Sequence, residues 1–180
     1  MSNTTLVMLT LAGAITALSF VRKKESLKMN ISQAGVDFIK KHEGLRLTEY
    51  KDQAGLSTIG YGHLNIPGAY YTEITEQQAE NILRGDLAVA ETAVRNAITR
   101  PMTQAQYDAF VSLAFNIGGA NFRTSTAVKR FNAGDKVGAA EALTWWNKIT
   151  DPSSGQKVVS NGLSFRRADE RDLFLTGSYA

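Results

Sequence analysis

The fold is most constrained by a short stretch in which a predicted helix ends and a predicted hairpin follows. Glu43 ends the helix, and residues 48–51 and 56–61 form two β-rich arms around a glycine-containing turn. A hairpin of this kind folds back on the end of the helix that precedes it. The sequence therefore predicts one cleft that gathers Glu43, Asp52 and Thr58.

Two carboxyl groups and a hydroxyl in one cleft suit the hydrolysis of a glycosidic bond. One carboxylic acid protonates the leaving oxygen, while a carboxylate assists water or stabilises the cationic sugar. The pair divides this work when the two environments keep one group protonated and the other ionised. Glu43, Asp52 and Thr58 are therefore candidate catalytic residues. The alternative is an ordinary pair of surface carboxyls around a hairpin.

The same stretch resembles the catalytic signature of the phage-type lysozymes, the endolysins of lambdoid and T-even phages. The resemblance lies in the runs Glu-Gly-Leu-Arg-Leu and Thr-Ile-Gly-Tyr-Gly-His, with Glu43, Asp52 and Thr58 at the family's spacing. It implies an inverting muramidase that cleaves the β-1,4 bond between N-acetylmuramic acid and N-acetylglucosamine of bacterial peptidoglycan during host lysis. Glu43 would be the general acid, Asp52 the ionised carboxylate and Thr58 the residue that positions water, with no cofactor.

Stretches further along the chain also resemble this family. They are Phe115-Asn116-Ile117-Gly118, Phe122-Arg123-Thr124-Ser125-Thr126, Trp145-Trp146 and the run from Arg166-Arg167 through Glu170-Arg171 to Phe174. By motif position, the resemblance implies that Leu64, Phe115 and Thr126 line the saccharide cleft. It also implies that Arg166 approaches the general acid from another lobe. Core packing is the alternative for Phe115 and the favoured interpretation for the tryptophans, and a solvated charge is the alternative for Arg166.

The amino-acid composition argues against disulfides and metal sites. The chain has no cysteine, which excludes disulfides and thiolate metal sites. His42 and His63 are too few for a histidine metal site, and no carboxylate cluster replaces them, so no metal is expected. We expect His63 to be held by Asp86 in a structural pair, in preference to a catalytic role.

The net charge of +3 comes from the beginning of the chain. Residues 1–28 carry four basic residues and one acidic residue, whereas residues 29–180 carry sixteen of each. A nucleic-acid-binding domain would carry a basic face on its folded part. The balanced charge of residues 29–180 therefore argues against nucleic acid as a partner.

The basic residues follow an apolar segment, residues 4–21, which contains no charged residue and no proline. As a helix its 18 residues would span about 27 Å, close to the ~30 Å of a bilayer core. Several threonines, a serine and a glycine make it weakly hydrophobic. It resembles the signal-anchors of some phage endolysins and predicts association with the host inner membrane. A cleaved signal peptide and a buried core helix are less favoured alternatives.

The topology of this segment stays open. Arg22, Lys23 and Lys24 follow the apolar run, and the positive-inside rule would then keep the enzyme in the cytoplasm. The resemblance instead implies an enzyme made in the host cytoplasm, held at the inner membrane and acting on periplasmic peptidoglycan. Translation from Met29 would bypass the segment and give a charge-neutral domain.

Capping and breaking residues predict the helices. Asn30 or Ser32 caps a helix over residues 31–42, and the capping box from Thr75 to Gln78 opens a helix that continues to about residue 99. That helix would span about 36 Å, more than one small core needs, which suggests a bridge between two lobes. The expected fold is α+β, mainly helical and two-lobed. Residues 1–28 would form the anchor and linker, and residues 29–180 the lysozyme domain. The protein is expected to be a monomer.

Beyond residue 100 the pattern is helical throughout. The expected helices are residues 103–117, 124–131, 135–146 and 164–175, with a stop at Gly118-Gly119, a loop at residues 152–155 and a final stop at Gly177.

Two other functions remain open. A lytic transglycosylase needs the acid but no second carboxylate, and Asp52 and Thr58 argue against it. A catalytically silent, membrane-tethered wall-binding protein would not need the three candidate residues at all.

Overall fold

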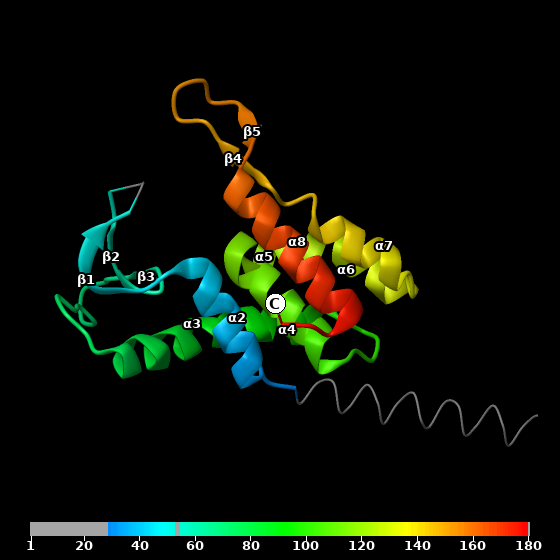
Figure 1. Cartoon of the computed structure of the whole chain (residues 1–180), viewed down its shortest axis with the longest axis horizontal. Helices are drawn as coiled ribbons and strands as arrows, with labels where there is room; N and C mark the ends of the chain where they lie inside the picture. The colour runs from blue at the N-terminus through cyan, green and yellow to red at the C-terminus, as the bar shows by residue number, and fades with distance from the viewer. Residues whose placement is uncertain (1–28, 53–54, 180) are drawn as a thin grey trace, which may run out of the picture.

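The computed structural model describes residues 29–52 and 55–179. In chain order its elements are α2 Gln33–Glu43, β1 Arg46–Lys51, β2 Ser57–Gly60, β3 His63–Leu64, α3 Glu76–Ala97, α4 Gln104–Ile117, α5 Gly119–Thr124, α6 Thr126–Ala133, α7 Lys136–Leu143, β4 Lys148–Thr150, β5 Lys157–Val159 and α8 Asn161–Thr176. Figure 1 shows the small sheet β1–β3 at one end of α3 and the helices α4–α8 gathered at the other end. The expected α+β, mainly helical class is confirmed.

The smaller lobe is a three-stranded antiparallel sheet in the order β1–β2–β3. The predicted hairpin is confirmed, because Tyr50 of β1 lies opposite Thr58 of β2. On its other side Thr58 pairs with Leu64 of β3. Gly60 and Gly62 have φ angles of +65° and +88°, which glycine adopts readily, and they lie where β2 turns into β3. The sheet therefore places Thr58 on its central strand.

α3 runs from the sheet to the larger lobe. It begins with the predicted capping box, in which Thr75 Oγ1 accepts from the Gln78 amide and Gln78 Oε1 accepts from the Thr75 amide. Its 22 residues give a length of about 33 Å. Its buried residues pack against β2 and β3 as well as α4 and α5; they are Ala79, Leu83, Leu87, Ala90, Glu91, Ala93 and Val94.

α4 forms the centre of the larger lobe, and it also begins with the predicted capping box, between Thr103 and Gln106. The ring of Phe110 meets the rings of three phenylalanines edge to face, at centroid distances of 5.1–5.5 Å from Phe122, Phe131 and Phe174. Because those three residues belong to α5, α6 and α8, this aromatic cluster joins four helices in one core.

The chain is tied to α3 and α4 before α2 begins, the contact with α4 being a hydrogen bond from Gln104 to the Asn30 carbonyl at 2.9 Å. Ser32 is the N-cap of α2, as predicted. The Ile31 amide donates to Glu91 at 2.7 Å, and Arg95 donates to the Met29 carbonyl at 3.1 Å. The folded part therefore already includes Met29.

The predicted membrane segment, residues 4–21, lies outside the described residues, as does the basic cluster after it. Among the helices that the structure describes, none has both the length and the apolarity needed to cross a membrane.

The helices differ from the predictions in two details. The predicted stop is confirmed, since α4 ends at Ile117 with Gly118 as its C-cap, but the short helix α5, which begins at Gly119, was not predicted. α8 begins at Asn161, three residues before the predicted start, since Ser160 accepts the Leu163 amide as N-cap.

The interpretation of residues 101–175 as uniformly helical was also wrong. Residues around the predicted loop form the hairpin β4–β5, in which Ile149 lies opposite Val158. Each strand has three residues, all of them exposed. Such strands show no alternation of buried and exposed residues, and that alternation is the signal by which a half-buried strand is recognised.

Candidate active site

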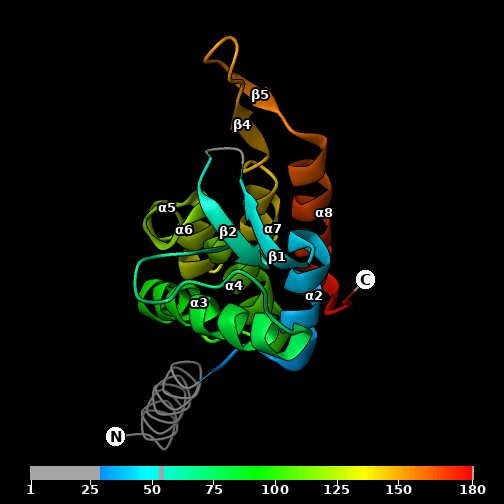
Figure 2. The ribbon, with the colours of Figure 1, turned by 90° about the vertical axis from the view of Figure 1, so that its left-hand side faces the viewer.

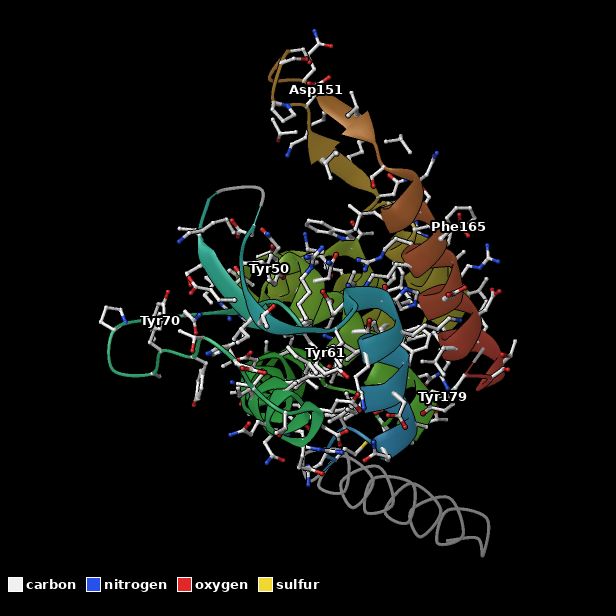
Figure 3. All side chains as sticks on the ribbon, turned by 60° about the vertical axis from the view of Figure 1, so that its left-hand side comes forward. Tyr50, Tyr61, Tyr70, Asp151, Phe165 and Tyr179 are labelled. Atoms are coloured by element: carbon white, nitrogen blue, oxygen red, sulfur yellow. The ribbon has the colours of Figure 1, made fainter. Side chains whose placement is uncertain are left out.

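A cleft with a volume of about 480 Å³ lies where the smaller lobe meets α3 and α4. It is lined by Glu43, Tyr61, Gly62, His63, Leu64, Ile66, Asp86, Phe115 and Asn116. Tyr61, labelled in Figure 3, lies between the sheet and α2, and its ring is 5.7 Å from the ammonium of Lys40. The cleft thus combines one carboxyl at the end of α2 with apolar and amide side chains from both lobes.

Glu43 is the last residue of α2, and Gly44 follows with a φ angle of +70° that ends the helix. The Glu43 side chain is 20% exposed, so it is accessible from the cleft without being fully hydrated. Arg166 of α8 donates through Nη1 to Glu43 Oε1 at 2.5 Å. Figure 2 shows α2 lying beside α8, as this contact requires.

Arg166 is not a solvated surface charge, since its side chain is only 5% exposed. Its remaining donors are directed at α4 and along α8. Nη2 donates to the carbonyl and the hydroxyl of Ser112, both at 3.3 Å, and Nε donates to Glu170 at 3.2 Å. The predicted approach of Arg166 to Glu43 is therefore seen, with the guanidinium fixed from three directions.

A second contact joins α2 to α8 beside this ion pair. His42 Nε2 lies 3.4 Å from Asp169, and its ring meets Phe38 edge to face. Burial lowers the pKa of His42 below its ordinary 6.5, and the positive charge of Arg166 lowers it further, while Asp169 acts in the opposite direction. His42 is therefore neutral at neutral pH.

Asp52 lies at the end of β1 and is partly exposed. Its Oδ1 accepts the Leu56 amide at 2.8 Å, and its own amide donates to the Leu56 carbonyl at 3.0 Å. These bonds hold the carboxylate at the turn of the hairpin. Asp52 is not among the side chains that line the cleft of about 480 Å³.

Thr58 is 2% exposed on the central strand. Its hydroxyl donates to the Leu56 carbonyl at 3.1 Å. A hydroxyl that donates in this way still has lone pairs that accept a hydrogen bond from water. Thr58 and Asp52 share Leu56 as a neighbour, so the hairpin turn fixes both side chains together.

His63 forms the predicted pair with Asp86, with Nδ1 at 2.9 Å from Oδ2. The two residues come from β3 and α3, and both line the cleft. The pair therefore joins the sheet to the long helix at the wall of the site.

Two of the three residues predicted to bind saccharide line the cleft. Leu64, 45% exposed, and Phe115, which also packs against the core, line the cleft. Thr126 is the first residue of α6 and is not among the lining side chains. The prediction of core packing is confirmed for Trp146 but wrong for Trp145, which is 52% exposed. The guanidinium of Arg130 lies over the ring of Trp145.

Tyr61 and Asn116 line the cleft but were not predicted to do so, although both stand within the quoted family runs. The contacts of Ser112 and Glu170 with Arg166 were not predicted either. The spacing of Arg166 and Glu170 by four residues was a signal for that ion pair, whereas nothing in the sequence marked Ser112.

The described part of the chain offers no group of side chains suited to bind a metal ion. Across residues 29–52 and 55–179 no three histidine, cysteine or acidic side chains are grouped so that they could hold an ion. Hydrolysis by an acid and a carboxylate needs neither a metal nor an organic cofactor.

The family model for phage lysozyme matches residues 40–170. The endolysin of Acyrthosiphon pisum secondary endosymbiont phage 1 is 44% identical over 149 residues, covering 81% of this chain and 98% of its own. The structure of an endolysin from Escherichia coli O157:H7 phage FAHEc1 superposes with a TM-score of 0.80 at 47% identity, over 85% of this chain and 98% of that one. The muramidase domain of SpmX from Asticaccaulis excentricus gives 0.76 at 40% identity, over 83% and 99%.

The chain therefore belongs to the phage lysozyme family. It is a lysozyme, a glycoside hydrolase whose substrate is bacterial peptidoglycan.

Proposed function

We propose that the protein is a muramidase that cleaves the β-1,4 bond between N-acetylmuramic acid and N-acetylglucosamine, with Glu43 as its general acid. The observation that carries the proposal is the position of Glu43, whose carboxyl lines the cleft together with apolar residues of both lobes, whereas the other lining carboxyl, Asp86, is paired with His63. A general acid donates its proton to the reacting group in the transition state. The proton would pass to the leaving glycosidic oxygen.

Asp52 and Thr58 complete the proposed mechanism. Asp52, held at the hairpin turn by the Leu56 amide, would activate or orient water and stabilise the oxocarbenium-like transition state. Thr58 would hold that water through its free lone pairs. Attack by water on the face opposite to the leaving group inverts the anomeric carbon, so the first product would be the α anomer. Proton NMR of the first minutes of digestion tests this, and a β anomer would indicate retention.

Saccharide binding is proposed for Leu64, Phe115 and Thr126. Leu64 and Phe115 offer apolar surface on the sheet side and on the α4 side of the cleft. Thr126, at the start of α6, would contact the glycan strand beyond that cleft.

We propose further that residues 1–28 are a membrane anchor with a basic linker and that residues 29–180 are the lysozyme domain, with the lobe boundary inside α3. Support comes from the uncharged residues 4–21 and from the hydrogen bonds that tie Met29 and Ile31 to α3. The enzyme would be made in the host cytoplasm, associate with the inner membrane and act as a monomer on periplasmic peptidoglycan. N-terminal sequencing of the native product would show whether translation starts at Met29 instead.

Mass analysis of the products tests the bond specificity. The full-length chain is incubated with purified peptidoglycan, and we expect muropeptides that end in reducing N-acetylmuramic acid. Anhydro-muropeptides, lighter by one water, would show a lytic transglycosylase. Fragments that end in reducing N-acetylglucosamine would show cleavage of the other bond, and no fragments would leave a silent wall-binding protein.

A further inference from the structure

A fully buried carboxylate stands behind the ion pair of the active site. Glu170 lies one turn after Arg166 on α8 and has no solvent exposure. Its Oε1 accepts three hydrogen bonds: from Ser112 Oγ at 2.7 Å, from Arg167 Nη2 at 2.9 Å and from Arg166 Nε at 3.2 Å. Glu170 therefore contacts two guanidinium groups at once, and one of these groups contacts Glu43.

The Arg167 guanidinium is charged at neutral pH. Arg167 is fully buried, and burial lowers its pKa to about 10, while the carboxylate of Glu170 raises it and Arg166 lowers it further. Its Nε and Nη1 find no hydrogen-bond partner among the described residues. Its contact with Glu170 is thus the hydrogen bond that compensates its charge.

The hydrogen bonds around Glu170 favour its ionised form. Burial raises its pKa, but Arg167, Arg166 and Ser112 all act against that change. Its second oxygen, Oε2, has no hydrogen-bond partner within the part of the chain that the structure describes. A proton on that oxygen would have no acceptor, whereas the charged form receives three donors on the other oxygen.

We propose that Glu170 is a positioning residue of the active site, which fixes the Arg166 guanidinium against Glu43 and cancels one of the two buried positive charges behind it. The proposal rests on the role of Glu43 as general acid put forward above. With Glu170 ionised, Glu43 faces one net positive charge from this cluster. Without that carboxylate it would face two, and the charged form of Glu43 would be favoured.

The other charged groups around Glu43 are the same in every variant of the test. On α2 they are Lys41 and His42, and on α8 the group is Asp169, which lies 4.0 Å from the Lys41 ammonium. In the wall of the same cleft they are His63 of β3 and Asp86 of α3. His42 is neutral above about its ordinary pKa of 6.5. On α4 the side chain that contacts the cluster is the uncharged Ser112. Differences between variants therefore report on Glu170 and Arg167.

The experiment measures pH–activity profiles of the full-length chain on purified peptidoglycan, with kcat and KM at each pH. In Glu170→Gln we expect the basic limb, where the acid loses its proton, to move to lower pH by about one unit. In Arg167→Met we expect the same limb to move to higher pH by about as much. The double variant restores the net charge, and its limb should return to within a few tenths of a unit of the wild type. KM should change less than threefold in all of them.

A purely structural role for Glu170 predicts different pH–activity profiles. Loss of packing would lower kcat at every pH, leave the limb in place and give no opposite shift in Arg167→Met. Either an unmoved limb or a shift of the same sign in both single variants overturns the proposal. Should Glu170→Gln fail to fold by circular dichroism, Arg167→Met and the double variant decide alone: an unmoved limb in Arg167→Met overturns it.

The failure of this proposal is distinguishable from the failure of the proposed function. Glu43→Gln is measured beside the other variants. If it keeps wild-type activity, Glu43 is not the acid and both proposals fail. If it is inactive while the limbs of the Glu170 and Arg167 variants coincide with that of the wild type, only the inference about Glu170 fails.

Discussion

Arg166 and Glu43, 123 residues apart in the sequence, form an ion pair at 2.5 Å that joins the end of α2 to α8. Because the arginine side chain is 5% exposed and the glutamate 20%, the pair is shielded from water and salt much more than a surface pair. It connects the candidate acid with the core of the larger lobe.

Removal of this buried charge should be costly. Arg166→Ala leaves the partly buried Glu43 without its ion-pair partner and removes one of the three donors to Glu170, and we expect the free energy of unfolding to fall by about 3–5 kcal/mol. Urea denaturation measures it. The matched control is Arg171→Ala on the same helix, whose pair with Asp172 is largely exposed and should contribute less than about 1 kcal/mol. Equal losses in the two variants would contradict the account.

Thr58 tests the positioning of water. Thr58→Val keeps the shape of the side chain and removes the hydroxyl, so we expect kcat to fall about a hundredfold while KM changes little. Thr48→Val, an exposed position on the neighbouring strand, is the control and should retain wild-type kcat. A fully active Thr58→Val enzyme would show that another group holds the water.

Leu64 tests the saccharide surface. Because the side chain is 45% exposed, truncation in Leu64→Ala should leave the thermal midpoint nearly unchanged. We expect KM to rise about tenfold, the equivalent of 1.4 kcal/mol, through lost contact with sugar. Val89→Ala, at an exposed position of α3 outside the cleft, serves as the control. An unchanged KM in Leu64→Ala would remove Leu64 from the binding surface.

His42 should make stability depend on pH in the acidic range. Its pKa in the folded state lies below 6.5, its ordinary value, so between those two values the unfolded chain binds more protons. Stability therefore falls as the pH drops through that window. In His42→Gln we expect a smaller loss of unfolding free energy between about pH 7.5 and about pH 5.5 than in the wild type. Identical losses would show that His42 does not contribute.

Local signals predicted much of the fold. Capping boxes involve residues three positions apart, so the helix starts at Thr75 and Thr103 were readable without tertiary information. The hairpin before Thr58 was equally local. The pairing of His63 with Asp86 was predicted as well.

What the sequence could not provide depends on contacts between distant segments. Arginine is usually a surface residue, and the burial of Arg166 follows only when α4 supplies Ser112 and α2 supplies Glu43. The hairpin β4–β5 was missed because its strands are short and exposed. The same limits apply to Thr126, whose distance from the cleft depends on how α6 packs.

The role of Glu43 as general acid is tested most directly by the rate at which Glu43→Gln releases reducing ends from purified peptidoglycan, compared with the wild type and with Glu49→Gln. Glu49 is a carboxylate of β1 that accepts hydrogen bonds from Ser57 and Tyr70 and has no proposed catalytic role. We expect Glu43→Gln to lose at least about a thousandfold in rate, while Glu49→Gln stays within about threefold of the wild type. A Glu43→Gln enzyme with near-wild-type rates would contradict the assignment of Glu43 as the general acid.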